Sequence, residues 1–270
     1  MNAHPASRRR FLALQGAFAA TALLSKQAAG QVLEDKRPQV ASLESGDFIW
    51  PKQPSQYVPF NSGSTMAYAD EKATWLAERR QFIAAVRADP SSTLEDRQFA
   101  SDLEFMDFSE FLTLYQADLS PGSPREFAGG VSPLYVGHVG IVQIANGKVD
   151  VVEAVWGKGV QRISYADWLA GRPDAWVWHG RLSGKTRAER SRIAEEAARH
   201  VSTRYNFWNF DLLDSTGFYC SKLCWHATQR ALGVALDDNP QARRRFWFSP
   251  KQMLKARSVD KLFSPGSYTF

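Results

Sequence analysis

Cysteine is scarce in this sequence, since Cys220 and Cys224 are the only two among 270 residues. They lie four positions apart in a segment with helical periodicity, which is a poor place for a disulfide between neighbouring turns. His226 follows closely, but Cys224 and His226 with no further Cys/His cluster do not make a zinc site. The sequence therefore favours free thiols and predicts neither a bound metal nor another cofactor.

The sequence has neither a strong excess of charge of one sign nor internal repeats. The formal net charge is +5 at pH 7, and the pI is about 9.2. No sustained basic face with interleaved aromatic side chains accompanies this charge, so nucleic acid is not an expected partner. A basic surface suits an anionic cell-wall or membrane target, but charge alone does not select one. Hydrophobic residues make up 44% of the chain, which is enough for the core of a globular protein.

No segment after the N-terminal region is apolar over the ~20 residues that a membrane-spanning helix needs. The N-terminus has a basic start at Arg8–Arg10, a short apolar stretch and small residues at Ala28–Gly30. This layout is typical of a secretory signal peptide, and an uncleaved membrane anchor is the alternative. The paired arginines followed by Phe11 and Leu12 resemble a twin-arginine signal. We therefore expect a signal peptide at 1–30 and an exported, periplasmic protein with no stable membrane span once the signal is removed.

Hydrophobic periodicity organises the rest of the chain into helices and strands. Residues 31–44 are a polar lead-in, one domain is expected over 45–255, and a C-terminal tail follows at 256–270. Strands are predicted at 48–50, 135–144, 149–155, 160–163 and 175–182, and helices at 69–88, 93–115, 165–169, 186–202 and 218–232. The pattern predicts an α+β fold with a mostly antiparallel sheet, and a helical insertion at about 61–130.

Two residues that suit proton transfer fall on neighbouring predicted strands. His138 stands between Gly137 and Gly140, and the turn at Asn146-Gly147 brings the next strand beside it. Glu153 interrupts that valine-rich strand, where a carboxylate is costly unless it is paired. Glu153 is thus expected to accept a hydrogen bond from the imidazole and to fix its tautomer. The alternatives are a histidine bonded to a backbone carbonyl and a glutamate that points to solvent.

Cys220 follows a turn at 214–217 and begins a predicted helix. At a helix N-terminus the dipole and the free N–H groups favour the thiolate form of a cysteine. The same N–H groups can hold a developing oxyanion. Cys224, one turn further along, is expected to be a small buried residue. A thiolate, a histidine and an orienting polar group are the parts needed for nucleophilic acyl transfer.

Four short motifs together resemble one known family. They are Gly46-Asp47-Phe48-Ile49, Gly137-His138-Val139-Gly140-Ile141-Val142, Val151-Val152-Glu153-Ala154 and Phe218-Tyr219-Cys220-Ser221-Lys222-Leu223, and Ser249-Pro250 also fits. In this order, with the histidine strand before the cysteine helix, they resemble the circularly permuted papain-like hydrolases, the NlpC-type superfamily in its YiiX/YebB-like branch. The resemblance covers about 45–250 without the insertion. It implies a papain-like sheet packed against the cysteine helix, with Cys220 as nucleophile, His138 as base and Glu153 as orienting residue.

The remaining histidines, the tryptophans and one acid are assigned structural roles. His179 is expected in a strand, His200 at the end of a helix, where a cation suits the dipole, and His226 in the core. Asp47 stabilises its own turn or borders the cleft. The scattered tryptophans, which could line a cleft, are more often core residues; they are Trp75, Trp168, Trp176, Trp178, Trp208 and Trp247.

The combined expectation is an exported thiol hydrolase that cleaves an amide bond through a Cys220 acyl-enzyme. Its expected partner is a peptide or acyl-amide substrate, such as a peptidoglycan-type stem peptide of the cell wall. An acyltransferase or thioesterase acting on lipid-type acyl groups is the alternative on the same residues. A third possibility, a binding module without turnover, is disfavoured because all three reactive positions are filled.

Overall fold

A computed structural model describes residues 36–52, 65–111, 137–209, 211–243 and 249–266. The expected signal peptide at 1–30, the loop around Pro54 and Pro59, the Gly/Pro/Ser-rich loop at 121–130 and Trp247 lie outside these residues. Among the helices of the described part, none is long and apolar enough to cross a membrane.

The centre of the domain is a six-stranded sheet in the order β4-β3-β2-β1-β5-β6, in which all neighbouring strands are antiparallel. Its strands are β1 (Phe48–Lys52), β2 (Gly140–Ala145), β3 (Lys148–Val155), β4 (Gly159–Ser164), β5 (Trp176–Leu182) and β6 (Val259–Phe263). The expected turn joins β2 to β3, with Asn146 and Gly147 both at positive φ. The predicted α+β class with an antiparallel sheet is confirmed.

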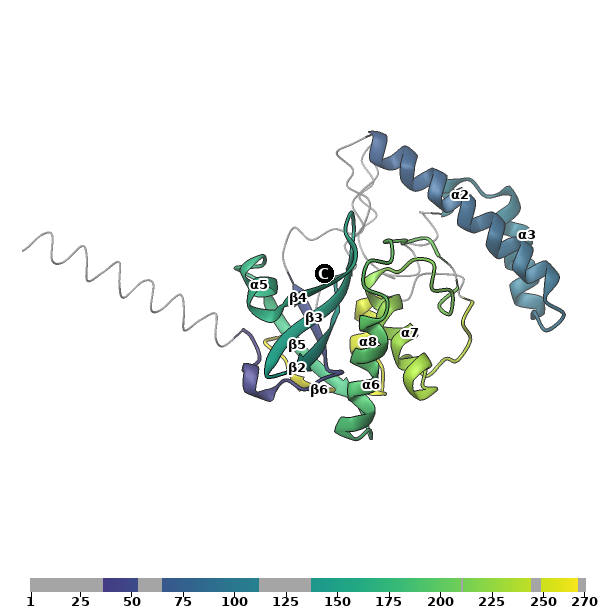
Figure 1. Cartoon of the computed structure of the whole chain (residues 1–270). Helices are drawn as coiled ribbons and strands as arrows, with labels where there is room; N and C mark the ends of the chain where they lie inside the picture. Colours follow the sequence, from purple (N-terminus) through teal and green to yellow (C-terminus); the bar gives the residue numbers. More distant parts are fainter. Residues whose placement is uncertain (1–35, 53–64, 112–136, 210, 244–248, 267–270) are drawn as a thin grey trace, which may run out of the picture.

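Helices cover both faces of this sheet (Figure 1). On one face, α6 (Arg187–Ala198) and α7 (Cys220–Leu232) pack against β2 and β3, and α8 (Pro250–Lys255) lies beside them. On the other face, the short helix α5 (Tyr165–Ala170) contacts β3 and β4. The two apolar layers follow the strand alternation, because Ile141 and Val152 face the larger cluster while Val142 and Val151 face the smaller one.

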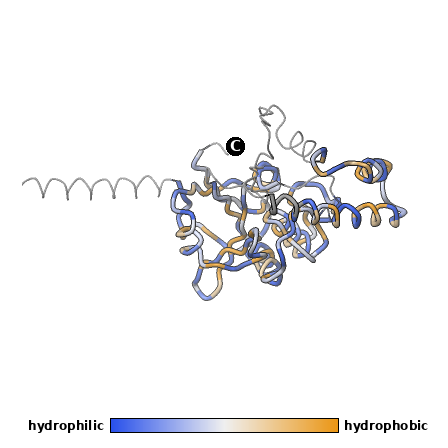
Figure 2. The backbone as a smooth tube through the Cα atoms, turned by 90° about the horizontal axis from the view of Figure 1, so that it is seen from above, coloured by the Kyte–Doolittle hydropathy of each residue, from blue (hydrophilic) through white to orange (hydrophobic). Residues whose placement is uncertain are grey.

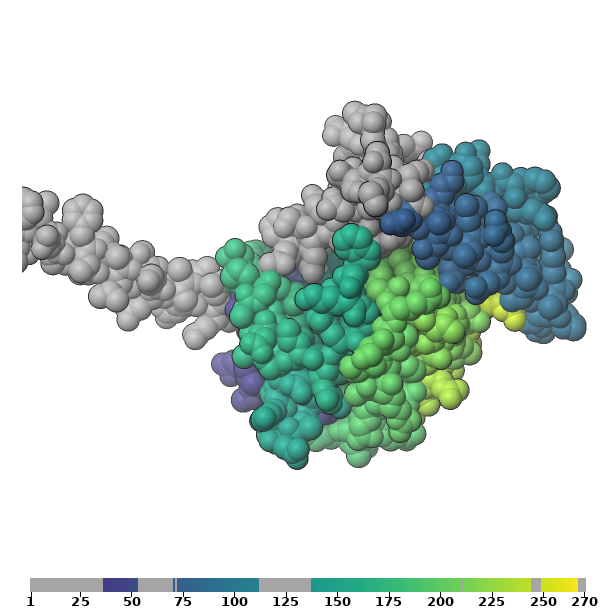
Figure 3. Space-filling model, turned by 45° about the horizontal axis from the view of Figure 1, so that its top comes forward, coloured from purple at the N-terminus to yellow at the C-terminus, as the bar shows by residue number. Residues whose placement is uncertain are grey.

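The insertion forms a pair of packed helices, α2 (Thr65–Ala88) and α3 (Leu94–Phe105), joined by a short turn. Apolar and hydrophilic stretches alternate along both helices (Figure 2). Trp75 of α2 packs on Phe108 and Phe111, and both phenylalanines meet Trp208 edge to face. The insertion is therefore held by the segment that leads into α7, and the two surfaces are continuous in Figure 3.

Polar contacts fix the same interface. Buried Glu78 of α2 accepts a hydrogen bond from the side chain of Asn206. At the far end of α2, Asp89 forms an ion pair with Arg243, which follows α7 in the chain. These contacts place the insertion against the approach to the cysteine helix, although in sequence it precedes the histidine segment.

Element boundaries differ from the predictions at three places. The strand expected from residue 135 begins only at Gly140, so His138 lies in the segment that leads into β2. Helix α3 ends at Phe105 instead of near 115, and a further helical turn at 108–111 follows the break. The expected tail at 256–270 contains β6, which pairs with β5 at the edge of the sheet. Most of β6 is exposed, so its sequence lacks the alternating pattern that marks a half-buried strand.

Candidate active site

The three residues expected to act together come from three separate elements that converge at one end of the sheet. Glu153 lies in the second half of β3, opposite Gln161 of β4. His138 lies two residues before β2, the strand that pairs with β3. Cys220 is the first residue of α7, which packs against β2 and β3. All three are buried, at 0%, 8% and 2% relative exposure for Glu153, His138 and Cys220.

The imidazole of His138 is held by the carboxylate of Glu153. His138 Nε2 lies 2.6 Å from Glu153 Oε2, a short charge-assisted hydrogen bond in which the ring N–H donates. The Cys220 side chain also interacts with His138 and raises its pKa. Because Nε2 is engaged by Glu153, Nδ1 is the ring nitrogen that remains for the thiol. The histidine therefore stands between the carboxylate and the thiol, in the arrangement of a nucleophile, a base and an orienting group.

Three further donors surround the Glu153 carboxylate. Trp168 Nε1 donates to Oε2 at 2.8 Å, and Gln161 Nε2 donates to Oε1 at 2.8 Å. Arg172 Nη2 lies 3.1 Å from Oε2 and also stacks on the Trp168 ring. A fully buried carboxylate is costly unless its lone pairs are satisfied, and here both oxygens accept hydrogen bonds. Glu153 is thus fixed in place, and it fixes His138 in turn.

Sequence analysis did not assign these donors to the site. Trp168 was expected in the core, and Gln161 and Arg172 were not singled out. Gln161 could have been found, because it lies eight residues beyond Glu153 across the β3–β4 hairpin, directly opposite in the register. Arg172 follows α5 and reaches back over it, a contact that no local pattern indicates.

The charges of the pair shift both pKa values in opposite directions. Burial alone would lower the pKa of His138, but the charge of Glu153 and hydrogen bonds to Cys220 and Glu153 overcome it and raise the pKa to about 9. Burial likewise opposes ionisation of Glu153, yet the charge and hydrogen bond of His138, together with Arg172 and Trp168, lower its pKa to about 2. Near neutral pH, His138 is therefore an imidazolium and Glu153 a carboxylate.

The two cysteines lie in different environments. Cys220 begins α7 after the N-cap residue Tyr219, and the first i to i−4 bond of this helix runs from Leu223 N to Tyr219 O. The backbone N–H groups of the first turn thus have no acceptor within the helix and point past its end, beside the thiol. Cys224 is fully buried, and burial and the neighbouring Cys220 raise its pKa well above the usual range. Only Cys220 combines a helix N-terminus with a histidine partner, as expected from the sequence.

Two glycines, Gly137 and Gly140, allow the backbone conformation around His138. Gly137 has φ +81°, a backbone conformation that residues other than glycine rarely adopt. A Cβ at Gly140 would lie 2.6 Å from Val151 Cγ1 and 3.6 Å from Glu153 Cβ. Strand β2 can therefore approach β3 closely just where Glu153 must meet His138.

Other residues weighed from the sequence take structural positions. Asp47 is fully buried, and its carboxylate accepts hydrogen bonds from the backbone N–H of Glu44, from His179 Nε2 at 2.7 Å and from Arg181. Burial opposes its ionisation, but these partners lower the pKa of Asp47. Asp47 stabilises its own turn, and His179 lies in β5 as expected. Within the described residues, one group could hold a metal ion, and it consists of Glu196, His200 and His226.

One known family matches the part of the chain that carries these three residues. Residues 123–262, about half of the chain, match the family of permuted papain-like amidase enzymes, YaeF/YiiX (peptidase family C92). The chain therefore belongs to the permuted papain-like amidases, and it is a cysteine hydrolase of that class. The resemblance seen in the four sequence motifs is confirmed.

One solved structure was also found to be similar, that of the metalloprotein YiiX from Escherichia coli O157:H7. It shares 20% sequence identity over 47% of this chain and 81% of the YiiX chain, with a TM-score of 0.38. The comparison with curated proteins gives no match.

Proposed function

We propose that Cys220 is the nucleophile, His138 the acid and base, and Glu153 the positioning residue of an exported amidase. The observation that carries the proposal is the place of His138, which is hydrogen-bonded to Glu153 and also interacts with Cys220. A buried imidazolium with a thiol on one side and a carboxylate on the other is suited to nucleophilic acyl transfer.

The reaction follows from these positions. The Cys220 sulfur, as a thiolate, attacks the carbonyl carbon of the amide, and the carbonyl oxygen becomes an oxyanion beside the N–H groups that begin α7. His138 Nδ1 then gives its proton to the amine, the C–N bond breaks, and a thioester to Cys220 remains. In the second half, His138 takes a proton from water, the hydroxide adds to the thioester carbon, and the C–S bond breaks. The products are a free amine and a carboxylic acid, and the thiolate is restored.

A pocket between the β3–β4 turn and the segment that leads into α7 supports a peptide substrate with a free carboxylate. It has a volume of about 390 Å³ and is lined by Trp156, Lys158 and Arg204 among others. Trp156 follows β3 three residues after Glu153, and another lining residue, Phe207, packs against Tyr219 beside Cys220. Lys158 suits the carboxylate of a peptide and the exposed indole of Trp156 suits its backbone, while Arg204 also lies 3.8 Å from Glu78. Stem peptides of peptidoglycan have amide bonds and free carboxylates, and we propose them as the substrate class.

Export is part of the proposal. The basic start, short apolar stretch and small residues at 1–30 support a twin-arginine signal peptide. The test is fractionation of cells that produce the full chain. The mature protein should be periplasmic, and the double substitution Arg8→Lys and Arg9→Lys should leave the precursor in the cytoplasm. Equal export of both chains would contradict a twin-arginine route.

The test of the activity is product analysis by liquid chromatography and mass spectrometry. The purified chain is incubated with soluble peptidoglycan fragments or with acylated lipids, and Cys220→Ala and Cys224→Ala serve as paired variants. We expect a new amine and a new acid from the peptide fragments, with loss of products for Cys220→Ala and retention for Cys224→Ala. Products from lipids alone would instead support the thioesterase or acyltransferase alternative.

A further inference from the structure

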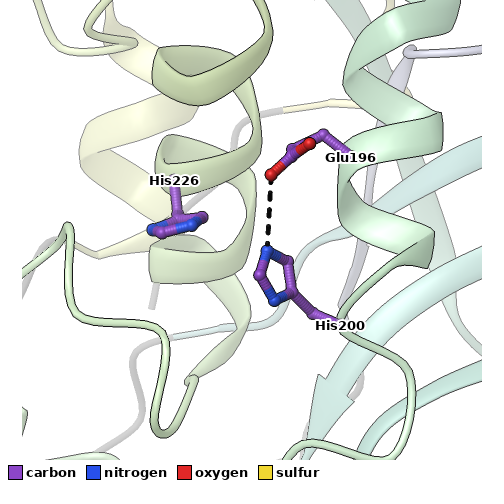
Figure 4. A group of neighbouring side chains, drawn as sticks. All are labelled: Glu196, His200 and His226. Atoms are coloured by element: carbon purple, nitrogen blue, oxygen red, sulfur yellow. Dashed lines mark ion pairs between the residues drawn. The ribbon is translucent and has the colours of Figure 1, made fainter.

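Two histidines and a glutamate converge between α6 and α7, on residues that the amidase proposal does not use. Glu196 lies near the end of α6, His200 two residues beyond that helix, and His226 in the middle of α7 (Figure 4). One ligand atom from each of the three lies within 4.8 Å of the others. The sequence suggested only Cys224 as a neighbour of His226, whereas the fold brings a carboxylate and a second imidazole to it.

The contact between Glu196 and His200 is too long for a hydrogen bond. His200 Nε2 lies 3.7 Å from Glu196 Oε1, and this nitrogen is buried without a hydrogen-bond partner. Two ligands at about 2.1 Å from one tetrahedral Zn²⁺ are separated by about 3.4 Å. The distance between His200 Nε2 and Glu196 Oε1 is thus close to that between two ligands of one zinc ion. The other carboxylate oxygen, Glu196 Oε2, accepts a hydrogen bond from Arg199 at 2.8 Å, which leaves Oε1 to face the histidine.

The ring of His226 is oriented as metal-binding histidines usually are. Its Nδ1 lies 3.0 Å from the backbone carbonyl of Leu212, so the ring proton is on Nδ1 and donates to that oxygen. The lone pair is then on Nε2. Histidines that bind metals commonly donate their other ring N–H to a backbone carbonyl, which fixes the tautomer and the orientation of the ring.

Aromatic packing holds both rings in place. Phe218, which precedes Cys220 by two residues, lies 4.7 Å from the His200 ring and 5.2 Å from the His226 ring, centroid to centroid. The two imidazoles meet nearly perpendicularly at 5.0 Å. His226 is buried, while Glu196 and His200 are partly exposed at 14% and 16% of their side chains. The packing therefore holds both rings, and the side chains of Glu196 and His200 lie nearest to solvent.

From this geometry we propose that Glu196, His200 and His226 form a binding site for Zn²⁺. Two imidazoles and one carboxylate are a common protein ligand set for zinc, and a water molecule would complete the tetrahedron. Zinc binding would draw the three atoms, now within 4.8 Å of one another, closer together through side-chain rotation. The ion would tie the end of α6 to the middle of α7, whose first residue is Cys220, so its role is to hold the cysteine helix against the domain.

The first test is zinc stoichiometry in the untagged full chain, measured by mass spectrometry of the metal after removal with a chelator, addition of Zn²⁺ and dialysis. Cys220→Ser serves as the background, so that the thiol does not bind zinc. We expect about one zinc per chain in this Cys220→Ser background. The same ratio is expected when Glu195→Gln is added to it, since Glu195 is an exposed residue next to Glu196 on α6. His200→Asn and Glu196→Gln should each retain less than a tenth of it. Mg²⁺ should not bind, because it prefers oxygen ligands.

Thermal unfolding is the second test. A melting transition shows that a variant is folded, and its shift with zinc reports binding to the folded chain. Zinc at a hundredfold excess over its Kd should raise the Tm of the background chain by about 5–10 °C. Glu195→Gln should show the same rise, and Glu196→Gln, whose side chain lies partly at the surface, should show none. Full stoichiometry or an equal rise in Tm for the ligand variants would overturn the proposal. Zinc bound by wild type but not by Cys220→Ser would also overturn it, because the ion would then lie at the thiol.

Discussion

The substitution Glu153→Gln probes how His138 obtains its proton. It preserves the size of the side chain but removes the charge that raises the pKa of His138 from the usual 6.5 to about 9. At 1.36 kcal/mol per pKa unit, the net shift corresponds to about 3 kcal/mol in favour of the imidazolium, and Glu153 is its largest favourable source. Burial, which disfavours the charged ring, remains in the variant. We therefore expect the pKa of His138 to fall to about 6.5 or below in Glu153→Gln.

The measurement is a pH titration of the His138 ring by NMR, which needs no substrate. A matched control is Asp150→Asn, a partly exposed carboxylate three residues earlier on the same strand. Wild type and the control should titrate near pH 9, and Glu153→Gln at least two pH units lower. At pH 7.5 the protonated fraction of His138 would then fall roughly tenfold, with a matching loss in amide cleavage. A titration midpoint that stays near pH 9 in Glu153→Gln would refute Glu153 as the source of the raised pKa of His138.

The remaining predictions concern reactivity, stability and the insertion. Iodoacetamide should modify Cys220 much faster than Cys224, whose raised pKa keeps it as a buried thiol, as peptide mapping by mass spectrometry would show; equal, slow labelling would count against the assignment. The His138–Glu153 pair should stabilise the fold most between pH 4.5 and 6.5, because the raised pKa of His138 makes the contribution decline as pH rises from 6.5 through about 9, and the lowered pKa of Glu153 makes it decline as pH falls from 4.5 towards about 2. Denaturant unfolding from pH 2 to 10 tests this, and an identical profile in Glu153→Gln would contradict it. Arg172→Met should cost about 1–3 kcal/mol in the same assay, since it removes a donor from a buried carboxylate, and no loss would mean that Gln161 and Trp168 suffice. Arg243→Ala should lower the Tm by a few degrees through its ion pair with Asp89; an unchanged Tm would show that the aromatic contacts alone hold the insertion.

Much of this site could be predicted because its parts have local signals. The Asn-Gly turn sets the hairpin between β2 and β3, so a glutamate within a valine strand had to face either solvent or a partner. The turn before Cys220 marks the start of a helix, and the chemistry of a helix N-terminus follows from that position. The antiparallel run of β2, β3 and β4 was predictable for the same reason, since strand alternation and turns are properties of neighbouring residues.

What sequence reasoning missed depends on contacts between distant residues. Arg172 reaches Glu153 across α5, and Glu196, His200 and His226 meet only because α6 packs on α7. The edge strand β6 has no apolar alternation to mark it, since it is held by backbone pairing to β5. The place of the insertion depends on aromatic side chains such as Trp75 and Trp208, which are far apart in the chain and carry no periodic pattern.

Trapping of the acyl-enzyme is the most direct test of Cys220 as the nucleophile. The full chain is mixed with soluble peptidoglycan fragments, quenched in acid within seconds, digested and mapped by mass spectrometry. We expect a thioester adduct on the peptide that contains Cys220, with the mass of the acyl part of the cleaved amide, and its disappearance in Cys220→Ala. Cleavage that continues without any adduct, or an adduct that maps to Cys224, would contradict the assignment of Cys220 as the nucleophile.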